Sequence, residues 1–238
     1  MAHLQVSGHP VVAGLRLTWR EFFPPLLNGT SAEGASPAFG VWVPDDPDAL
    51  LDELTQVEFD RSDERMPYFG TIWESAESLV AHVLAGPRLD GRRVLDLGCG
   101  LGLCGFAAAS RGAHVTFFDW EPRAVEIVAA SARTQGLRPG TFDLVVGDWR
   151  TPPPMGPFDL ILGADVLYER RNAPSVAAFL SSALKPGAQA WMTDPGRPQA
   201  EAFAACVERE GLQLRSRQLL PPQPHGVGIV LFCIRRPG

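Results

Sequence analysis

An aspartate and a tyrosine stand three residues apart in the segment ADVLY, residues 164–168, which follows the apolar run PFDLILG. A carboxylate is costly to bury at the end of a core strand unless it is paired or takes part in chemistry. Asp165 could orient an incoming ammonium group, and Tyr168 could line a channel or accept a hydrogen bond. We predict that the pair is catalytic; the alternatives are that Asp165 caps the following loop and that Tyr168 packs in the core.

A glycine-rich turn follows another apolar run, in RRVLDLGCGLGLCGF, residues 92–106. Glycines at such a turn adopt positive φ and let a ligand approach the backbone closely. One pattern here, G-x-G-x-x-G over residues 100–105, matches a dinucleotide fingerprint, with Asp119 about 20 residues on. The competing frame begins at Asp96. A carboxylate is unfavourable beside a pyrophosphate because both are negatively charged, but it can bind a ligand's ammonium group. We favour this second frame, which uses Asp96, Gly98, Gly100 and Gly102.

Two further acids end apolar runs, and each is followed by a tryptophan. Asp119 could accept hydrogen bonds from both hydroxyls of a ribose, with Trp120 lying along a purine. Trp149, after Asp148, could cover the same ring, since stacking on a base is commonly worth ~1–3 kcal/mol. The alternatives are a helix cap for Asp119, and for the second pair a surface aspartate with a tryptophan under a proline-rich loop.

These residues must be positioned by a regular alternation of strands and helices that starts near residue 92. The predicted strands are Arg93–Leu97, Val115–Asp119, Asp143–Gly147, Phe158–Gly163 and Ala188–Thr193, and the predicted helices are Ser75–Leu84, Leu103–Ser110, Pro122–Gln135, Ala173–Leu184 and Gln199–Glu210. Such alternation predicts a parallel sheet with helices on both faces. Ligands bind such sheets at the carboxyl ends of the strands, which is where the acids stand.

Both ends of the chain depart from this alternation. Two strand-like runs, Leu212–Leu219 and Gly228–Ile234, are joined by a segment too short for a crossover helix, which predicts an antiparallel hairpin. The first 65 residues contain many Pro and Gly, and we expect an irregular extension with one or two short strands, in LRLTWR and FGVWVP, and a short helix near Pro47–Leu54. We therefore divide the chain into an extension, 1–65, and a main domain, 66–238.

The composition is ordinary for a globular protein: 238 residues, 45% of them hydrophobic and 20% charged, with a net charge of −6. A negative net charge argues against a broad nucleic-acid surface. Neither a signal stretch nor a long apolar run is evident, which predicts a cytoplasmic protein without a membrane partner. The four cysteines form no C-x-x-C pair, so we expect no metal and no disulfide framework. The oligomeric state is left open, with a monomer favoured.

The frame Asp96-x-Gly98-x-Gly100-x-Gly102 resembles motif I of class I S-adenosylmethionine-dependent methyltransferases. The resemblance implies a Rossmann-like, doubly wound, seven-stranded α/β sheet, mostly parallel, and the cofactor S-adenosyl-L-methionine, which becomes S-adenosyl-L-homocysteine. It also implies that Asp148 binds the adenine amino group and that the cofactor's methyl group points toward the strand end at Ala164.

A narrower resemblance comes from three segments. ADVLY resembles the D-x-x-Y motif of the seven-β-strand lysine methyltransferases, family 16; in FGTIWESAESL, Trp73 resembles a tryptophan of the cofactor cleft; and TDPGRPQ, residues 193–199, resembles the electron-transfer-flavoprotein β-subunit lysine methyltransferases. In that last segment, Arg197 could bind a substrate carboxylate or pair with Asp194. The resemblance covers about residues 66–210.

The predicted function is S-adenosylmethionine-dependent methylation of a lysine side chain in a protein. The alternatives are an N-methyltransferase of a small amine or metabolite, a short NAD(P)-binding oxidoreductase, and a binding protein that keeps the fold without catalysis. The predicted catalytic residues are Asp165 and Tyr168, and the predicted cofactor-binding residues are Trp73, Asp96, Gly98, Gly100, Gly102, Asp119, Trp120, Asp148, Trp149 and Ala164.

Overall fold

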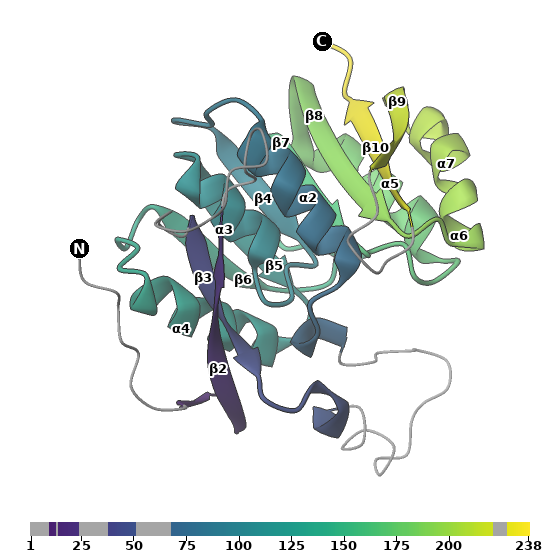
Figure 1. The fold of residues 1–238 in the computed structure, drawn as a ribbon. Coiled ribbons are helices and arrows are strands. Elements are labelled where there is room, and N and C mark those ends of the chain that lie inside the picture. Colours follow the sequence, from purple (N-terminus) through teal and green to yellow (C-terminus); the bar gives the residue numbers. More distant parts are fainter. Residues whose placement is uncertain (1–9, 13, 24–37, 51–67, 221–227) are drawn as a thin grey trace.

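A single seven-stranded sheet forms the centre of the computed structural model, which describes residues 10–12, 14–23, 38–50, 68–220 and 228–238 (Figure 1). In spatial order its strands are β6 (Phe142–Val146), β5 (His114–Asp119), β4 (Arg93–Leu97), β7 (Phe158–Ala164), β8 (Leu184–Asp194), β10 (Ile229–Arg235) and β9 (Gln213–Leu220). The first five pair in parallel, and β10 lies antiparallel between β8 and β9. The predicted fold class is confirmed.

The predicted strands agree with the observed ones to within one or two residues, apart from the start of β8. This strand begins at Leu184 instead of Ala188, because the preceding helix ends at Ala183 and the chain enters the sheet without a loop. The hairpin of β9 and β10 is present as predicted, and the connecting residues 221–227 lie outside the described part of the chain.

The helices cover both faces of the sheet, as Figure 1 shows. They are α2 (Glu74–Ala85), α3 (Leu103–Ser110), α4 (Pro122–Thr134), α5 (Asn172–Ala183), α6 (Pro198–Glu201) and α7 (Phe203–Arg209), with a 3₁₀ turn η1 (Tyr68–Gly70) before α2. The single helix predicted over 199–210 is thus two helices that meet at Ala202. The other predicted helices are confirmed with ends that differ by one residue at most.

Local sequence explains where α4 begins and ends. Pro122 occupies the first turn, where its missing N–H is not needed. The Glu121 carboxylate caps the helix by accepting a hydrogen bond from the Arg123 N–H at 3.1 Å. Gly136 follows the helix with φ of 69°, the left-handed conformation that commonly ends a helix. The predicted alternative of Asp119 as the cap of this helix is therefore wrong, because Glu121 has that role.

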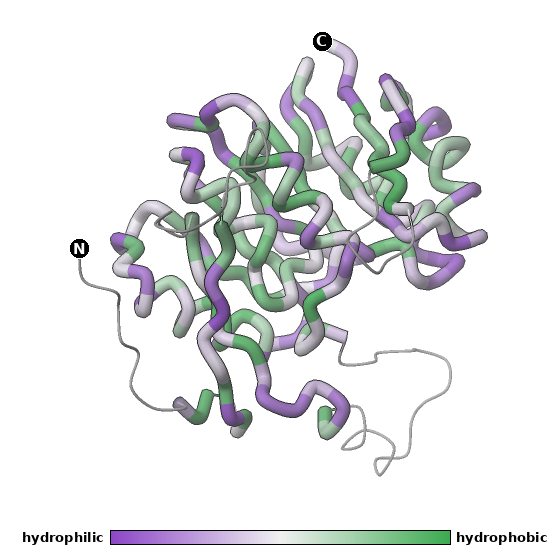
Figure 2. Tube along the Cα trace, in the orientation of Figure 1, coloured by the Kyte–Doolittle hydropathy of each residue, from purple (hydrophilic) through white to green (hydrophobic). Residues whose placement is uncertain are grey.

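The strands separate two hydrophobic clusters because successive side chains point to opposite faces of a sheet. On β4, Val94 belongs to the cluster under α2, α3 and α4, whereas Leu95 and Leu97 belong to the cluster under α5 and α7. Figure 2 shows hydrophobic residues along the central strands and hydrophilic ones toward the outer turns. The strand ends that carry the acids are thereby held on both sides by packed helices.

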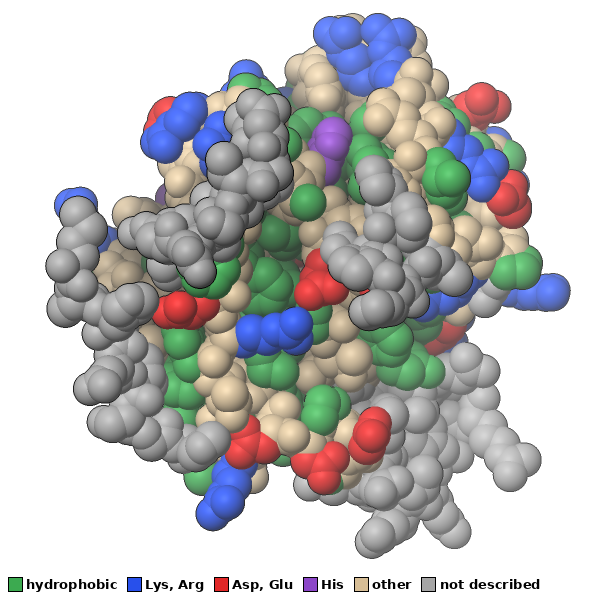
Figure 3. Space-filling model, viewed as in Figure 1, with side chains coloured by type: hydrophobic (Ala, Val, Ile, Leu, Met, Phe, Trp, Pro, Cys, Tyr) green, Lys and Arg blue, Asp and Glu red, His purple; other side chains and the backbone are tan. Residues whose placement is uncertain are grey.

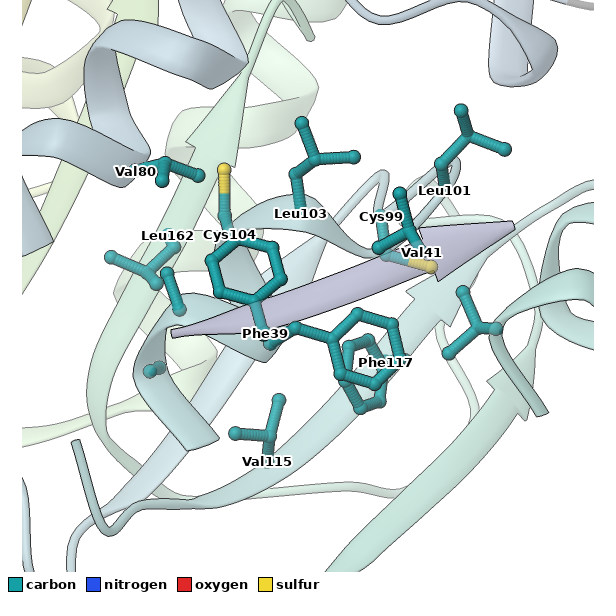
Figure 4. Packing of buried hydrophobic residues seen from close by; sticks show 14 of the residues in the cluster. Phe39, Val41, Val80, Cys99, Leu101, Leu103, Cys104, Val115, Phe117 and Leu162 are labelled. Atoms are coloured by element: carbon teal, nitrogen blue, oxygen red, sulfur yellow. The ribbon is translucent and has the colours of Figure 1, made fainter. Parts of the chain in front are cut away.

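The N-terminal extension contributes a second sheet to the first of these clusters. Its strands, β1 (Val11–Val12), β2 (Leu15–Phe22) and β3 (Phe39–Pro44), are antiparallel in that order. Phe39 and Val41 of β3 pack among Phe117, Leu101 and Leu103 of the main domain (Figure 4). The expectation of one or two strands in an irregular extension is therefore corrected to a three-stranded sheet. Residues 47–50 are helical, and the remainder of the predicted helix lies outside the described part.

The edge of β3 is joined to α4 by side-chain hydrogen bonds. The backbone N–H of Trp42 donates to Ser131 Oγ at 2.9 Å, and that of Gly40 donates to Gln135 Oε1 at 3.2 Å. The Trp42 indole N–H donates to Thr134 Oγ1 at 2.9 Å. An edge strand exposes backbone donors that need partners. Here the polar residues of α4 supply them, which fixes the small sheet against the main domain.

The surface carries charges of both signs, and Figure 3 shows acidic side chains and Lys or Arg side chains spread over one face. Within the described ranges, no helix is both long and apolar enough to cross a membrane. The same residues contain no group of three or more His, Cys, Asp and Glu side chains arranged to hold a metal ion.

Candidate active site

A cavity of about 340 Å³ opens at the carboxyl ends of β4, β5 and β7. This volume lies within the range of ~300–1,000 Å³ typical of small-molecule sites. The cavity is lined by most of the predicted site residues: Trp73, Asp96, Gly98, Gly100, Asp119, Trp120, Trp149, Ala164, Asp165 and Tyr168. Two predicted residues, Gly102 and Asp148, are not among its lining residues. Segments from four strand ends and from the turn before α2 are therefore brought together.

The glycine turn lies close against its neighbours on the cavity wall. Gly98 and Gly100 have φ of 64° and 50°, which side chains rarely adopt. A Cβ on Gly98 would lie 2.8 Å from Val166 Cγ1, and one on Gly100 would lie 3.3 Å from the Phe69 carbonyl oxygen. Both positions therefore require glycine for conformation and for space.

Gly102 has a different place from the one predicted. It is the residue before α3, with φ of 81°, and a Cβ there would meet the side chains of Phe106, Val128 and Phe117 at 3.0–3.1 Å. These are core residues beneath the turn. Gly102 thus starts the helix and permits close packing, and its predicted contact with a cofactor stays a prediction.

Asp96 is 2% exposed, is the residue before the last of β4 and lines the cavity. Its Oδ2 accepts a hydrogen bond from the Gly105 N–H at 2.7 Å. Burial, with a smaller effect of the Asp119 charge, raises the pKa of Asp96 to about 8 despite this hydrogen bond. A carboxyl group in this state is suited to a cationic ligand, since a nearby positive charge would restore its ionised form.

Asp119 ends the neighbouring strand β5 and has both oxygens directed at backbone donors. Oδ2 accepts from the Gly100 N–H at 2.8 Å and Oδ1 from the Glu121 N–H at 3.0 Å. Burial raises the pKa of Asp119 to about 6, and the hydrogen bonds oppose this rise. A carboxylate has about four acceptor sites, so lone pairs remain for a ligand's hydroxyl groups.

The side chains of Asp148 and Trp149 have different surroundings: Asp148 pairs with Arg150 outside the cavity, and Trp149 lines the cavity. The Asp148 carboxylate forms a bidentate pair with Arg150, whose Nη2 donates to Oδ2 at 2.5 Å. The Trp149 ring lines the cavity, and its buried indole N–H has no hydrogen-bond partner among the described residues. The adenine contact predicted for Asp148 stays a prediction.

Asp165 follows β7 in a left-handed conformation, with φ of 61°, and is the one non-glycine residue of the described part with positive φ. Such backbone conformations cluster at functional sites. Its N–H donates to the Thr193 carbonyl at 2.9 Å, and its side chain is 10% exposed. Its carboxylate accepts a hydrogen bond from Arg197 Nη1, which also contacts Asp194. The predicted pairing of Arg197 with Asp194 is thus present, together with a contact to Asp165 that the sequence analysis missed.

Three aromatic rings stand at the same end of the cavity. Tyr68 and Tyr168, the two tyrosines of the chain, lie edge to face with ring centroids 5.4 Å apart. Trp73 lies 5.9 Å from Tyr68, and its indole N–H donates to the Tyr68 carbonyl at 3.1 Å. Burial and the nearby Glu169 raise the pKa of Tyr168, so its hydroxyl stays protonated and cannot act as a base at neutral pH. Tyr68 was missed, although it precedes Trp73 in an aromatic segment, PYFGTIW.

Comparisons with known proteins agree with this geometry. Residues 94–187 match a family described as a methyltransferase domain. Among curated proteins, the chain is 35% identical over 122 residues to protein N-lysine methyltransferase METTL21A of Danio rerio (49% of this chain, 56% of the relative). It is 31% identical over 161 residues to electron transfer flavoprotein beta subunit lysine methyltransferase of Rattus norvegicus (66% and 60%), and 27% identical over 186 residues to ubiquinone biosynthesis O-methyltransferase of Xylella fastidiosa (78% and 65%). The chain spans about 56–65% of the length of these relatives.

Solved structures share the fold at lower sequence identity. N-methyltransferase NodS of Bradyrhizobium japonicum superposes with a TM-score of 0.55 at 20% identity, covering 68% of this chain and 94% of that one. Magnesium protoporphyrin IX methyltransferase of Synechocystis gives 0.57 at 20% identity, covering 76% and 85%. Sheet order, glycine turn and strand-end acids define a class I, seven-β-strand methyltransferase fold. Residues 94–187 match a methyltransferase domain, which agrees with the predicted class, and S-adenosyl-L-methionine is the cofactor of that class.

Proposed function

We propose that this protein is an S-adenosyl-L-methionine-dependent methyltransferase that methylates a lysine side chain of a protein. The observation that carries the proposal is that carboxyl groups at successive strand ends, Asp96, Asp119 and Asp165, line one cavity together with the glycine turn. The first two suit a ligand with an ammonium group and a ribose, and the third lines the same cavity together with the rings of Tyr68, Trp73 and Tyr168.

The residues present fit the cofactor. The buried Asp96, with its raised pKa, is suited to the ammonium group of the methionine part. Asp119 keeps acceptor sites for the ribose hydroxyls, and the turn at Gly98 and Gly100 leaves the backbone open to close approach. When bound, S-adenosyl-L-methionine supplies an electrophilic methyl group: the amine lone pair forms the new N–C bond while the S–C bond breaks and its electron pair stays on sulfur.

The remaining task of the protein is to hold and desolvate the acceptor. Tyr68, Trp73 and Tyr168 form an apolar wall that can surround the methylene chain of a lysine and exclude water. Asp165 can accept a hydrogen bond from the acceptor's N–H. Relatives named as lysine methyltransferases support a protein lysine as the acceptor. The partner is then a protein with an accessible lysine, and the cytoplasmic location and monomeric state stay predictions.

The alternatives differ in ligand and in product. The ubiquinone relative, which matches the largest share of this chain among those described above, favours a small-molecule acceptor instead. An oxidoreductase would bind a nicotinamide dinucleotide, but a pyrophosphate at the glycine turn beside Asp96 would place negative charges together. A binding protein without catalysis would keep cofactor affinity and transfer no methyl group.

Two measurements test the proposal. Calorimetry with S-adenosyl-L-homocysteine and, separately, NADH should show binding of the first alone, and preference for NADH would contradict the proposal. Incubation of the protein with methyl-labelled S-adenosyl-L-methionine and host lysate should then place label on lysine in a protein fraction. Label in small molecules would support the metabolite alternative. Omission of the enzyme and Asp96→Asn are the controls; the first gives the background from the lysate's own methyltransferases, and the second should add no label above it.

A further inference from the structure

Two carboxylates stand side by side after the neighbouring strands β7 and β8, and one of them lines the cavity. Asp165 follows β7, and Asp194 is the last residue of β8. The two strands are parallel neighbours with Ala164 opposite Thr193, so the residues after them meet at one edge of the sheet. Like charges this close disfavour each other's ionised form. A positive group between them is therefore expected, and Arg197 is that group.

A short turn holds Arg197 in place. The Arg197 N–H donates to Asp194 Oδ1 at 2.7 Å and its Nη1 contacts Asp194 Oδ2 at 3.1 Å, while the same Nη1 donates to Asp165 Oδ1. Gly196 has φ of 80°, and Pro198 begins α6 directly after Arg197. Burial alone would lower the pKa of Arg197, but Asp165 and Asp194 more than offset this, so the guanidinium stays charged.

The cavity meets one carboxylate and one guanidinium at this end. Asp165 and Arg197 line it, whereas Asp194 is fully buried behind them and is not among the lining residues. The other titratable side chains toward this end are Tyr68, Tyr168 and Glu169, and Glu169 is paired with Arg171. Asp96, Asp119 and Glu121 line the part assigned to the cofactor, and the charge of Asp119 also acts on Tyr168. The cavity therefore meets Asp165 as one half of an ion pair and not as a lone carboxylate.

The charge at this end decides the protonation state of a bound amine. A lysine has a pKa of ~10.4 in water and must lose its proton to become a nucleophile. A lone carboxylate nearby would raise the amine pKa and keep the unreactive ammonium form. A carboxylate already paired with arginine lacks this effect but can still accept a hydrogen bond from a neutral amine.

We propose that Arg197 is a positioning residue that pairs with Asp165 so that the acceptor is held as an uncharged amine. The inference rests on the proposed function, because it concerns the acceptor of the same site. The ammonium proton passes to water before the amine is enclosed, and the lone pair that it leaves is the one that takes the methyl group. This revises the prediction that Asp165 draws in an ammonium by its free charge.

The first test is the pH dependence of kcat, which reports groups in the enzyme–substrate complex. In Arg197→Met the unpaired Asp165 should move the rising limb of kcat upward by about one pH unit or more. Arg197→Lys keeps the charge and should leave the limb within a few tenths of a unit. Arg217→Met, which removes an arginine paired with Glu201 outside the cavity, is the matched control and should not move it. An unmoved limb in Arg197→Met would overturn the inference.

The second test needs no turnover and uses n-butylamine as a probe for the lysine side chain. At pH 7, Arg197→Met bound to S-adenosyl-L-homocysteine should bind n-butylammonium at least about ten-fold more tightly than the wild-type complex does. This gain is expected because Asp165 would then face the cation unpaired. Equal affinity in the two complexes would contradict the inference. The affinities of wild type and Arg197→Met for S-adenosyl-L-homocysteine itself should agree within about three-fold. If wild type does not bind S-adenosyl-L-homocysteine at all, that result would count against the proposed function and not against this inference.

Loss of Arg197 leaves a fully buried carboxyl group, Asp194, without its partner, and Arg197→Met could therefore fail to fold. The double variant Asp194→Asn/Arg197→Met removes that buried charge and leaves Asp165 unpaired. It should show an upward shift of the kcat limb and a gain in n-butylammonium affinity, both smaller than in Arg197→Met because a negative charge behind the site is lost as well. A folded double variant with neither change would also overturn the inference.

Discussion

Asp165 joins a left-handed backbone, a nearly buried carboxylate and an arginine partner at one position. A left-handed backbone at a non-glycine residue and a buried carboxylate both cost free energy. Both occur here at a residue that lines the cavity, as Tyr68 and Tyr168 do. Asparagine tolerates positive φ and keeps hydrogen-bonding capacity, but it cannot balance the charge of Arg197. Replacement of Asp165 by asparagine can therefore distinguish a catalytic role from a structural one.

Asp165→Asn should leave the affinity for S-adenosyl-L-homocysteine within about three-fold of wild type. Turnover should fall by about 100-fold or more, because a misplaced acceptor loses the effective concentration on which the reaction depends. Calorimetry and initial rates on the same preparation measure the two quantities. If Asp165 only caps the following loop, asparagine would serve equally well and the rate would be unimpaired.

Asp119 and Asp148 offer a second comparison between residues. Asp119→Ala should weaken S-adenosyl-L-homocysteine binding by ~1.5–3 kcal/mol, the range for a hydrogen bond to a charged group. Asp148→Ala should weaken it by roughly ten-fold if Asp148 contacts the adenine as the sequence predicts. Calorimetry on both variants measures this, with melting temperatures as the control for folding. Unchanged affinity in Asp148→Ala would limit this residue to its pairing with Arg150.

At the scale of elements, the junction of β3 with α4 links the N-terminal sheet to the domain that holds the site. The Trp42 N–H and Ser131 Oγ are both buried, so water cannot replace this bond if it is lost. An unpaired buried donor costs about 1–3 kcal/mol. Neither Trp42 nor Ser131 lines the cavity. A substitution at this junction should therefore change the stability of the protein without changing ligand binding.

Ser131→Ala should lower the free energy of unfolding by about 1–3 kcal/mol, or the melting temperature by ~2–12 °C at ~2–4 °C per kcal/mol for a chain of this size. Affinity for S-adenosyl-L-homocysteine should not change. Ser181→Ala is the matched control and should stay within about 0.5 kcal/mol; Ser181 is a partly exposed serine of α5 whose Oγ donates to the Glu210 carbonyl. Urea unfolding of the three proteins decides the matter. Equal stability of the two variants would show that the junction does not hold the sheet.

Elements that are specified locally could be predicted from the sequence, and contacts between distant elements could not. The bounds of β4 and α3 follow from an apolar run and a glycine turn that are adjacent in the chain. The three-stranded N-terminal sheet depends on Ser131 and Gln135, about 90 residues further on. Likewise, Arg197 reaches Asp165 only because β7 and β8 are neighbours, which no spacing in the sequence reveals.

At the scale of the whole molecule, the packed helices on both faces hold two buried acidic groups, Asp96 and Asp119, beside the cavity, where burial controls their protonation. The raised pKa of Asp96 means that this group stabilises the free protein at low pH, below its ordinary pKa of about 4. That contribution is lost as the pH rises through about 8. The same carboxyl group is the one expected to meet the cofactor's ammonium. Ligand binding and proton release should therefore be linked.

Binding of S-adenosyl-L-homocysteine should release a proton near pH 6.5 and become tighter as the pH rises toward 8. At pH 6.5 Asp96 is largely protonated in the free protein, and a bound ammonium favours its ionised form, so affinity can rise by up to ten-fold per pH unit and then level. Calorimetry at pH 6.5 in two buffers of different ionisation enthalpy measures the released proton directly. Asp119→Asn is the control. Because the pKa of Asp119 is about 6, this group is mostly ionised at pH 6.5 before the ligand binds and can release little further proton. Most of the proton release should therefore remain in the variant. An apparent enthalpy that is the same in both buffers would show that Asp96 does not change its protonation state on binding, and its assignment to the ammonium would then be wrong.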